Sequence, residues 1–302
     1  MGEAMRLGID LGGTKIEAAI LNNNGHMIWQ KRQQTSKLSY DETITRITGL
    51  VDDARQSTGF AGPIGIGVPG SIRRSTGKSQ GASLTYLNNR DLQSDLKSAL
   101  NTDVRMANDA NCFALSEATD GAGKGCEVVF GLILGTGCGS GIVINGRPLS
   151  GINGIAGEVG HNPLPWPITD EYLNHDCWCG NSGCIETFIS GTAISKDYYD
   201  RTGVDIPVED IAARINTDLV AQSVFQVLED RLARTLAMVI NTLDPDVIIL
   251  GGGLSNLDRL YQNVPPKWSQ LVFSKDIETK LLKPHYGDSS GVRGAAWLWP
   301  DE

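Results

Sequence analysis

Short apolar runs that end in glycine-rich or polar turns alternate with longer amphipathic segments along this chain. Three such runs, at residues 6–11, 16–21 and 27–32, are joined by the turn sequences GGTK and NNNGH, and they predict three strands in a meander. Between residues 40 and 57, apolar side chains recur at helical spacing, which predicts an amphipathic helix. The pattern therefore predicts mixed α/β structure.

The same alternation continues further along the chain. A buried strand is predicted at residues 64–70, where IGIGV runs into a Pro-Gly stop, and leucines spaced along residues 92–100 predict a helix. Another strand is predicted at residues 104–109, directly before a helix that Asn108 or Asp109 can cap. Three further elements complete the prediction: helices within residues 207–242, a strand at 246–253 and a small-residue helix over GDSSGVRGAAWLW.

A sequence repeat divides the chain into two halves. Residues 130–145 (FGLILGTGCGSGIVIN) repeat residues 7–22 (LGIDLGGTKIEAAILN) as strand, glycine turn and strand, with Gly135 on Gly12. Asn145 falls on Asn22 in the same register. Two copies of one hairpin, each followed by α/β structure, indicate a duplication. A length of 302 residues also suits two domains.

The expected domain boundaries follow from this repeat. We expect an N-terminal α/β domain at residues 5–118 and a C-terminal α/β domain at residues 119–287. The C-terminal domain contains a cysteine-rich loop that is expected to bind zinc. The small-residue helix at about 288–302 can pack back on either half, and we place it on the N-terminal domain. Residues 1–4 precede a second methionine, Met5, and are left out of this division.

Composition narrows the class of protein. A net charge of -9 and a pI near 5.0 argue against binding to nucleic acid. The sequence has no long uncharged apolar run, no signal-peptide core and no lipidation motif. We therefore expect a cytoplasmic protein with no membrane partner.

Two glycine turns, LGGTK at residues 11–15 and LGTGCGSG at residues 134–141, have the chemistry of phosphate binding. Glycine lets backbone N–H groups approach an anion closely, because no Cβ blocks them, and Thr14 and Thr136 add hydroxyl groups. Either turn alone is more simply a tight hairpin bend, and neither has Walker A or dinucleotide-binding spacing. Their repetition, together with Asp10 at the end of an apolar strand, favours a polyphosphate held from both sides. Asp10 would then face Mg²⁺ through water.

Two other strand ends offer ligand contacts. GGG at residues 251–253 follows the apolar strand VIIL, where a flat adenine or ribose fits as well as a plain strand-to-helix turn does. MANDANC places Asn108 and Asp109 at the end of another strand, where each residue can simply cap the next helix. Strand ends in α/β sheets also hold ligands, and a carboxylate there can take the proton from an attacking hydroxyl.

The cysteine spacing is the most specific signal in the sequence. Cys177, Cys179 and Cys184 lie close together in CWCGNSGC, and His161 precedes them in GEVGHNPL. Three thiolates and one imidazole form the closed tetrahedral set of structural zinc sites. His175 is a rival fourth ligand, and buried free cysteines or a redox pair are the alternatives to metal.

Glu158 and Glu186 bracket this loop, and the loop's expected role is to fix these two carboxylates where they can hydrogen-bond a polyol. The other cysteines have no partner pattern and are expected to be small core residues: Cys112, Cys126 and Cys138. Four tryptophans are most simply packing residues: Trp166, Trp178, Trp297 and Trp299.

The motifs GIDLGGTK, NDANC, GTGCGSG, GEVGH and CxCGxxGCIE, in this order, resemble those of the ROK family of bacterial sugar kinases and related repressors. VIILGGG and GVRGAA extend the resemblance over nearly the whole chain from Met5. It implies an actin-like ATPase (ribonuclease H-like) fold, in which two α/β domains are hinged around a cleft. Within the family, GHNPLPW, CIETFISGT and LDPDVIILGGG are most similar to bacterial fructokinases (mannofructokinases).

The resemblance also implies roles for individual residues. Asp109 matches the general base of the family, and His161 matches a residue that both binds sugar and holds zinc. The sugar-binding positions are Asn108, Asp109, Glu158, His161 and Glu186. The nucleotide-binding positions are Gly8, Ile9, Asp10, Leu11, Gly12, Gly13, Thr14, Lys15, Gly135, Thr136, Gly137, Cys138, Gly139, Gly252 and Gly253.

The expected activity is transfer of the γ-phosphoryl group of MgATP to the 6-hydroxyl of a hexose, with fructose first and mannose or glucose behind it. The alternatives are a kinase for an N-acetylhexosamine, a sugar-sensing repressor of the same family, and an ATP-binding module in which Asp109 is only a helix cap. The expected cofactors are ATP, Mg²⁺ and structural Zn²⁺, and the expected assembly is a homodimer.

Overall fold

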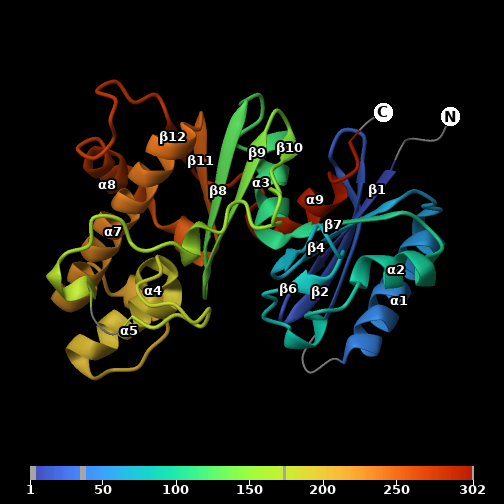
Figure 1. Ribbon diagram of the computed structural model, residues 1–302, viewed down its shortest axis with the longest axis horizontal. Coiled ribbons are helices and arrows are strands. Elements are labelled where there is room, and N and C mark those ends of the chain that lie inside the picture. Colours follow the sequence, from blue (N-terminus) through green and yellow to red (C-terminus); the bar gives the residue numbers. More distant parts are fainter. Residues whose placement is uncertain (1–4, 35–38, 173–174, 301–302) are drawn as a thin grey trace. The chain divides into compact units, whose positions relative to one another are not determined.

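The computed structural model describes residues 5–34, 39–172 and 175–300, and Figure 1 labels most of its helices and strands. The chain divides into two compact units. Unit 1 contains the described residues up to Gly125, residues 141–157 and those from Asp288 onward, and unit 2 contains residues 126–140 and 158–287. Residues 1–4, set aside above, lie outside the described residues.

This division departs from the predicted boundaries in two stretches. Residues 119–125 and 141–157 belong to unit 1, although the C-terminal domain was expected to run from 119 to 287. The physical reason for the second stretch is visible at Gly141, because a Cβ there would overlap the carbonyl of Ala110 in α3 (Asp109–Thr119). The chain at that point therefore lies directly on a helix of unit 1. The segment from Asp288 onward belongs to unit 1.

Unit 1 is built on a mixed five-stranded sheet in the order β3-β2-β1-β4-β7. β1 pairs antiparallel with β2 and parallel with β4, and β4 pairs parallel with β7. Side chains along β1, β2 and β4 are buried almost throughout, which is why these strands are apolar runs in the sequence. The strands of this unit are β1 (Met5–Leu11), β2 (Lys15–Asn22), β3 (Met27–Gln34), β4 (Ile64–Val68), β5 (Ser71–Ile72), β6 (Ser79–Gln80) and β7 (Val104–Asn108).

The helices of unit 1 begin and end where the sequence provides caps. α1 (Tyr40–Thr58) begins with a capping box, in which Ser39 and Glu42 each accept a hydrogen bond from the other's backbone N–H. Gly59 ends this helix in the left-handed conformation, with φ at 73°. The other helical elements of unit 1 are η1 (Thr85–Leu87), α2 (Leu92–Leu100), α3 and α9 (Ser290–Ala296), and η5 (Gly287–Ser289) begins at the last residue of unit 2 and leads into α9.

α9 packs on the sheet of unit 1 through glycines in two neighbouring strands (Figure 1). A Cβ at Gly8 in β1 would overlap the carbonyl of Val292, and a Cβ at Gly65 in β4 would overlap the carbonyl of Ala295. Glycine is therefore required in both strands for the helix backbone to approach this closely. Residues far apart in the sequence thus share one core.

The second sheet has the order β10-β9-β8-β11-β12. β11 pairs parallel with both β8 and β12. Its strands are β8 (Val128–Leu134), β9 (Cys138–Ile144), β10 (Arg147–Pro148), β11 (Val247–Gly251) and β12 (Lys280–Leu282). The helical elements between β10 and η5 are η2 (Val159–His161), η3 (Thr169–Tyr172), α4 (Glu186–Ile189), α5 (Gly191–Thr202), α6 (Val208–Ala213), α7 (Leu219–Leu243), η4 (Gly253–Asn256) and α8 (Asp258–Trp268). None of the described helices combines the length and the apolar content needed to cross a bilayer.

The two sheets have the same strand order, which confirms the duplication predicted from the sequence. In each sheet a central strand lies between its hairpin partner and a parallel strand: β1 lies between β2 and β4, and β8 lies between β9 and β11. The structural repeat keeps the register of the sequence repeat, because Met5 and Val128 begin the two central strands. Lys15 and Cys138 begin their hairpin partners in the same register.

A buried ion-pair cluster fixes the long loop between β10 and α4 onto α7. Arg234 donates hydrogen bonds to both carboxylate oxygens of Glu171, at 2.8 and 2.7 Å, and Arg231 Nε donates to Oε1 at 2.9 Å. Burial by itself would raise the pKa of Glu171, but the hydrogen bonds, first from Arg234, hold it at about 2. Arg234 also donates to the carbonyl of Trp166 at 2.9 Å, so the loop is held at two points.

Candidate active site

The carboxyl edge of the sheet in unit 1 carries Asp10, predicted to face Mg²⁺, and two of the predicted sugar-binding residues, Asn108 and Asp109. β1, β4 and β7 run parallel, so their carboxyl ends share one edge of the sheet. Asn108 Nδ2 donates to the carbonyl of Gly70 at 2.8 Å, which joins the ends of β7 and β4. The negative charge of Asp109 contributes to raising the pKa of Asp10, so the two carboxylates lie within electrostatic reach of each other.

The Asp10 carboxylate accepts no hydrogen bond from the part of the chain that the structure describes. Desolvation raises its pKa to about 7, with further contributions from the charges of Asp109 and Glu17, and the charge of Lys15 opposes the shift. A half-buried carboxylate without a donor is unfavourable. A divalent cation would supply the missing positive charge, so the surroundings of Asp10 fit the predicted Mg²⁺.

Asn108 and Asp109 begin α3. Asn108 Oδ1 accepts from the N–H groups of Ala110 and Asn111, at 2.9 and 3.2 Å, so this residue does cap the helix. Asp109 Oδ1 accepts from the Ala110 N–H at 2.8 Å, and the residue is otherwise exposed. Protein around it still limits hydration of the carboxylate and raises its pKa, while the backbone N–H groups act against the shift. A fixed, accessible carboxylate of raised pKa is suited to accept a proton.

The first glycine turn links β1 to β2. The Gly12 N–H donates to the Lys15 carbonyl at 2.9 Å, which closes the bend. Gly13 and Thr14 are exposed, and a Cβ at Gly13 would meet no atom within 4 Å. The outer side of this turn is therefore open to a ligand.

The predicted nucleotide positions before this turn lie in the core. Gly8 packs against α9, and the side chains of Ile9 and Leu11 are fully buried. These three residues support the turn through β1 and offer no side chain to a ligand.

The second glycine turn links β8 to β9, and much of its hydrogen-bonding capacity is already used. The Gly135 N–H donates to the Gly137 carbonyl at 3.1 Å, and the Cys138 N–H donates to Glu186 Oε2 at 2.9 Å. Among the described residues, the N–H groups of Thr136 and Gly137 have no such acceptor, and Thr136 is exposed. These two N–H groups are the ones that the turn can offer to an anion.

Gly252 packs directly against this second turn. Its φ is 75°, and a Cβ there would lie 2.5 Å from the carbonyl oxygen of Leu134 and 2.9 Å from the nitrogen of Gly135. Gly253 beside it is exposed, and a Cβ there would meet no atom within 4 Å. The structure thus brings together the two nucleotide segments predicted in unit 2, residues 135–139 and 252–253.

Glu158 and Glu186 both approach the first residue of β9. Desolvation raises the pKa of the Cys138 thiol, and the charges of Glu186 and Glu158 raise it further. A Cβ at Gly160 would overlap the Cys138 carbonyl, so the η2 turn, which includes His161, lies against the start of β9. The sugar-binding residues predicted in unit 2 therefore surround the end of its glycine turn.

The four predicted metal ligands converge. One ligand atom from each of His161, Cys177, Cys179 and Cys184 lies within 4.8 Å of every other. The Sγ atoms of Cys179 and Cys184 are 3.7 Å apart, and Cys177 Sγ is 3.5 Å from His161 Nδ1. A tetrahedral zinc ion with Zn–S bonds of about 2.3 Å separates its sulfur ligands by about 3.8 Å. The donor set and its spacing therefore fit zinc.

The rival explanations for these cysteines are less compatible with the structure. The ring of His175 lies against Phe188, with centroids 4.1 Å apart, and His175 is not in the ligand group found within the described residues. None of the six cysteines forms a disulfide, and Cys179 is exposed, so the group is neither an oxidised redox pair nor a set of uniformly buried thiols. Desolvation raises the pKa of the Cys184 thiol to about 12, so a cation is needed to stabilise its thiolate.

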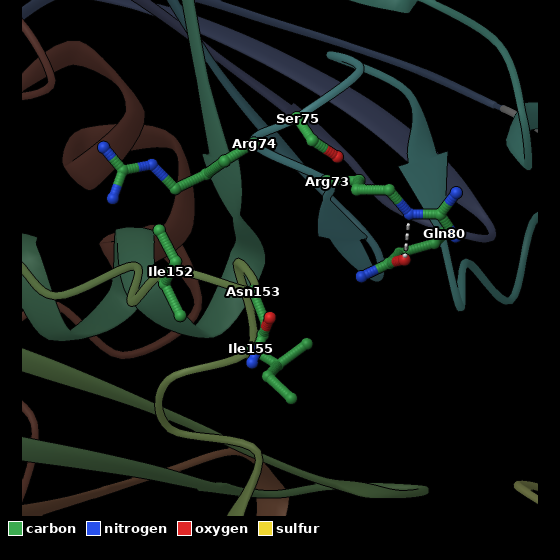
Figure 2. A pocket seen from close by; sticks show the side chains of 7 residues that line it. All are labelled: Arg73, Arg74, Ser75, Gln80, Ile152, Asn153 and Ile155. Atoms are coloured by element: carbon green, nitrogen blue, oxygen red, sulfur yellow. Dashed lines mark hydrogen bonds between the residues drawn. The ribbon is translucent and has the colours of Figure 1, made fainter.

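A surface pocket of about 570 Å³ in unit 1 involves none of the predicted site residues (Figure 2). Its walls come from the loop between β5 and β6, from β6 itself and from the loop after β10, with the residues Arg73, Arg74, Ser75, Gln80, Ile152, Asn153 and Ile155. Arg73 Nε donates to the Gln80 side chain at 3.1 Å, as Figure 2 shows, and Arg74 donates to the Gly151 carbonyl at 3.4 Å. The residues predicted to bind sugar, nucleotide and metal therefore do not line this pocket.

One contact of the site was missed by sequence reasoning. Trp178, expected only to pack, donates a hydrogen bond from Nε1 to Glu186 Oε1 at 2.7 Å, although the residue is 67% exposed. Its ring meets that of His161 edge-on, with centroids 5.0 Å apart. The signal that could have distinguished this tryptophan from the others is its position between Cys177 and Cys179.

Comparison with known proteins identifies what this chain is similar to. Two curated relatives, from Pectobacterium carotovorum and Histophilus somni, are each 40% identical to it, over 299 and 301 residues respectively. The matches cover 97% and 98% of this chain and 98% and 99% of the relatives, and both relatives are named N-acetyl-D-glucosamine kinase. The similarity to fructokinases inferred from the sequence is therefore not supported by these relatives.

Solved structures show the same fold. A ROK hexokinase from Thermus thermophilus superimposes with a TM-score of 0.86 at 25% identity, over 97% of both chains. A ROK family glucokinase from Streptomyces griseus, in complex with glucose and AMPPNP, gives a TM-score of 0.81 at 26% identity, over 98% of this chain and 99% of that one. The predicted two-domain actin-like ATPase fold is thereby confirmed. Residues 6–302 match the ROK family as a whole, and the chain belongs to that family.

Proposed function

We propose that this chain is an ATP-dependent sugar kinase whose preferred acceptor is N-acetyl-D-glucosamine. The observation that carries the proposal is the 40% identity, over 97% of this chain, to a kinase named for that sugar. The fructose preference expected from the sequence loses support, because relatives at this level of similarity carry another name. The same relatives support the alternative expected from the sequence, a kinase for an N-acetylhexosamine.

Asp109 is the proposed general base. The 6-hydroxyl oxygen of the sugar attacks the γ-phosphorus of ATP, the bond from that phosphorus to the β–γ bridging oxygen breaks, and the hydroxyl proton passes to the Asp109 carboxylate. The products are a sugar phosphate and ADP. Phosphoryl transfer depends mainly on positioning and charge neutralisation, and Asp109 is held in place by the Ala110 N–H at the start of α3.

The remaining residues position the reactants in this proposal. Sugar hydroxyls are held by Asn108, Glu158, His161 and Glu186. The nucleotide is held by the turn at residues 12–15, the turn at residues 135–139 and the pair Gly252–Gly253. Asp10 is the proposed side chain that would hold Mg²⁺, and the ion would neutralise charge on the triphosphate.

His161, Cys177, Cys179 and Cys184 would hold Zn²⁺ with all four positions filled by protein. A closed site of this kind stabilises the fold and leaves no position for a substrate. The homodimer and the cytoplasmic location stay predictions from the sequence.

An assay of ADP release across several sugars tests the acceptor. With saturating MgATP, we expect kcat/KM to be highest for N-acetyl-D-glucosamine and roughly 10- to 100-fold lower for glucose, because a site that hydrogen-bonds the acetamido group is left unpaired without it. Fructose and mannose should also be poorer acceptors, and NMR of the product should show a 6-phosphate. A higher kcat/KM for fructose would overturn the proposed acceptor.

A further inference from the structure

The metal loop and the second glycine turn are joined by a continuous chain of side-chain contacts within unit 2. Trp178 lies in sequence between the ligands Cys177 and Cys179. Its Nε1 donates to Glu186 Oε1 at 2.7 Å, and the other carboxylate oxygen, Oε2, accepts from the Cys138 N–H at 2.9 Å. One carboxylate therefore connects the cysteine loop to the backbone of the turn.

The chain that follows the last cysteine ligand holds the same turn from a second side. The Gly191 N–H donates to the Gly135 carbonyl at 2.7 Å, and Thr192 Oγ1 donates to the Thr136 carbonyl at 2.8 Å. A Cβ at Gly137 would lie 2.7 Å from Glu186 Oε2, so a larger residue there would displace the carboxylate from its present position. Contacts with residues 186–192 thus set the conformation of the turn.

We propose that Trp178 is a positioning residue that couples metal binding at His161, Cys177, Cys179 and Cys184 to nucleotide affinity at the turn of residues 135–138, through Glu186. The inference rests on the proposed function, because it takes this turn as part of the nucleotide site. Loss of the hydrogen bond between Trp178 and Glu186 should weaken nucleotide binding, because of the charge of the carboxylate. A carboxylate released beside an anion-binding turn repels phosphate and competes for the free N–H groups of Thr136 and Gly137.

Metal binding affects the orientation of Trp178, because the metal fixes the residues on both sides of it. With Cys177 and Cys179 bound to one ion, the indole is held so that its N–H faces Glu186 and its ring stays in T-shaped contact with that of the ligand His161. Without the ion, this orientation loses its support. The tryptophan is then free to leave Glu186, whose carboxylate can turn toward the phosphate.

The variant Trp178→Phe tests the hydrogen bond alone, because phenylalanine keeps an aromatic ring against His161 and removes only the indole N–H. Trp166→Phe is the matched control, since Trp166 is also exposed (49%) and its only described hydrogen bond is through its carbonyl. For the metal-loaded proteins, we expect the Kd of a non-hydrolysable ATP analogue, measured by calorimetry, to rise about tenfold in Trp178→Phe. It should stay within twofold of wild type in Trp166→Phe, with equal zinc content in all three proteins.

Two further comparisons measure the coupling itself. Removing the metal should weaken analogue binding by a much larger factor in wild type than in Trp178→Phe, because the variant has already lost the connection. In the loaded proteins, Glu186→Gln cannot accept from both N–H donors, and adding Trp178→Phe to it should cause no further loss of affinity. The second comparison decides the question if the metal-free protein unfolds.

Equal factors for metal removal in wild type and Trp178→Phe, or an unchanged Kd in loaded Trp178→Phe, would overturn the inference. Its failure is distinguishable from failure of the proposed function. A wild-type protein that binds the analogue and shows the coupling, but phosphorylates no sugar, would contradict only the proposed activity.

Discussion

At the scale of single residues, the carboxylates at the edge of the first sheet differ from ordinary surface carboxylates. Desolvation raises the pKa of Asp10 to about 7 and also raises the pKa of Asp109 above its usual value. Neighbouring negative charges add to the shift at Asp10. Sites that bind substrate or metal commonly hold charge at the expense of folding stability, and this edge has that character.

Replacement of Asp10 by Asn should stabilise the protein in the absence of Mg²⁺, and the gain should depend on pH. The pKa of an aspartate in an unfolded chain is about 3.9, whereas the pKa of Asp10 in the folded chain is raised to about 7. Asp10 therefore lowers the free energy of unfolding progressively as the pH rises from about 4 to about 7. Urea unfolding should show a gain of about 4 kcal/mol for Asp10→Asn at pH 8 and of only about 1 kcal/mol at pH 4.5. An equal gain at both values would contradict the raised pKa.

Asp109→Asn should separate chemistry from binding. The asparagine oxygen can still accept from the Ala110 N–H, so the start of α3 should persist and the melting temperature should change little. Loss of the base should lower kcat by about 10²- to 10⁴-fold, while the affinities for the ATP analogue and the sugar stay within a few-fold. Normal turnover in this variant would show that Asp109 is only a helix cap.

Single residues were predictable from sequence where the residue type carries its own chemistry. His161, Cys177, Cys179 and Cys184 could be grouped because their spacing is typical of metal ligands, and the structure brings the four side chains together, while the zinc ion itself stays a prediction. The role of Trp178 was not predicted, because the sequence does not show which acceptor an indole N–H meets. The pairing of Arg231 with Glu171 was also unpredictable, because 60 positions separate them in the sequence.

At the scale of elements, the strands and helices followed closely from periodicity and caps. The helix predicted at residues 40–57 is α1 (Tyr40–Thr58), and the strand predicted at 6–11 is β1 (Met5–Leu11). Local pattern sufficed because these elements have strong alternation, a capping box or a terminating glycine. The long loop after β10 had no such pattern. Its conformation depends on the ion pairs with α7 and on the cysteine cluster.

Substitution of Gly65 tests the contact between α9 and the sheet. A Cβ in Gly65→Ala would overlap the carbonyl of Ala295, so the helix must move away and the free energy of unfolding should fall by about 2–4 kcal/mol. Gly49→Ala is the matched control, because Gly49 lies inside α1 with no atom near its Cβ position. That variant should gain about 0.5–1 kcal/mol from helix propensity. Equal effects in the two variants, measured by urea unfolding, would contradict the packing argument.

At the scale of the whole molecule, the sequence predicted two duplicated halves but not how the chain is shared between them. Residues 141–157 return to unit 1 after β8 and the second glycine turn have been formed in unit 2. Contacts such as that of Gly141 with Ala110 decide this exchange, and local periodicity carries no information about them. The repeat therefore revealed the architecture, and the boundaries needed the structure.

Metal removal should affect the two units differently. The predicted ligands all lie in unit 2, and a structural zinc site contributes directly to folding. A zinc-selective chelator, with Mg²⁺ in excess, should increase hydrogen exchange at least about tenfold in the loop before α4 and in the turn at residues 135–138. The amides of β1 and β4 should exchange at their original rates. A uniform increase over both units, or none, would contradict a local structural role for the metal.

The packing of α9 onto Gly8 and Gly65 also constrains how the protein is made. Strands β1 and β4 leave the ribosome early, yet their helix partner is translated last among the described elements. During synthesis the glycine-lined face of that first sheet stays uncovered while everything up to residue 287 emerges. This apolar surface must therefore avoid contacts with other chains until α9, which contains Ala295, has been translated.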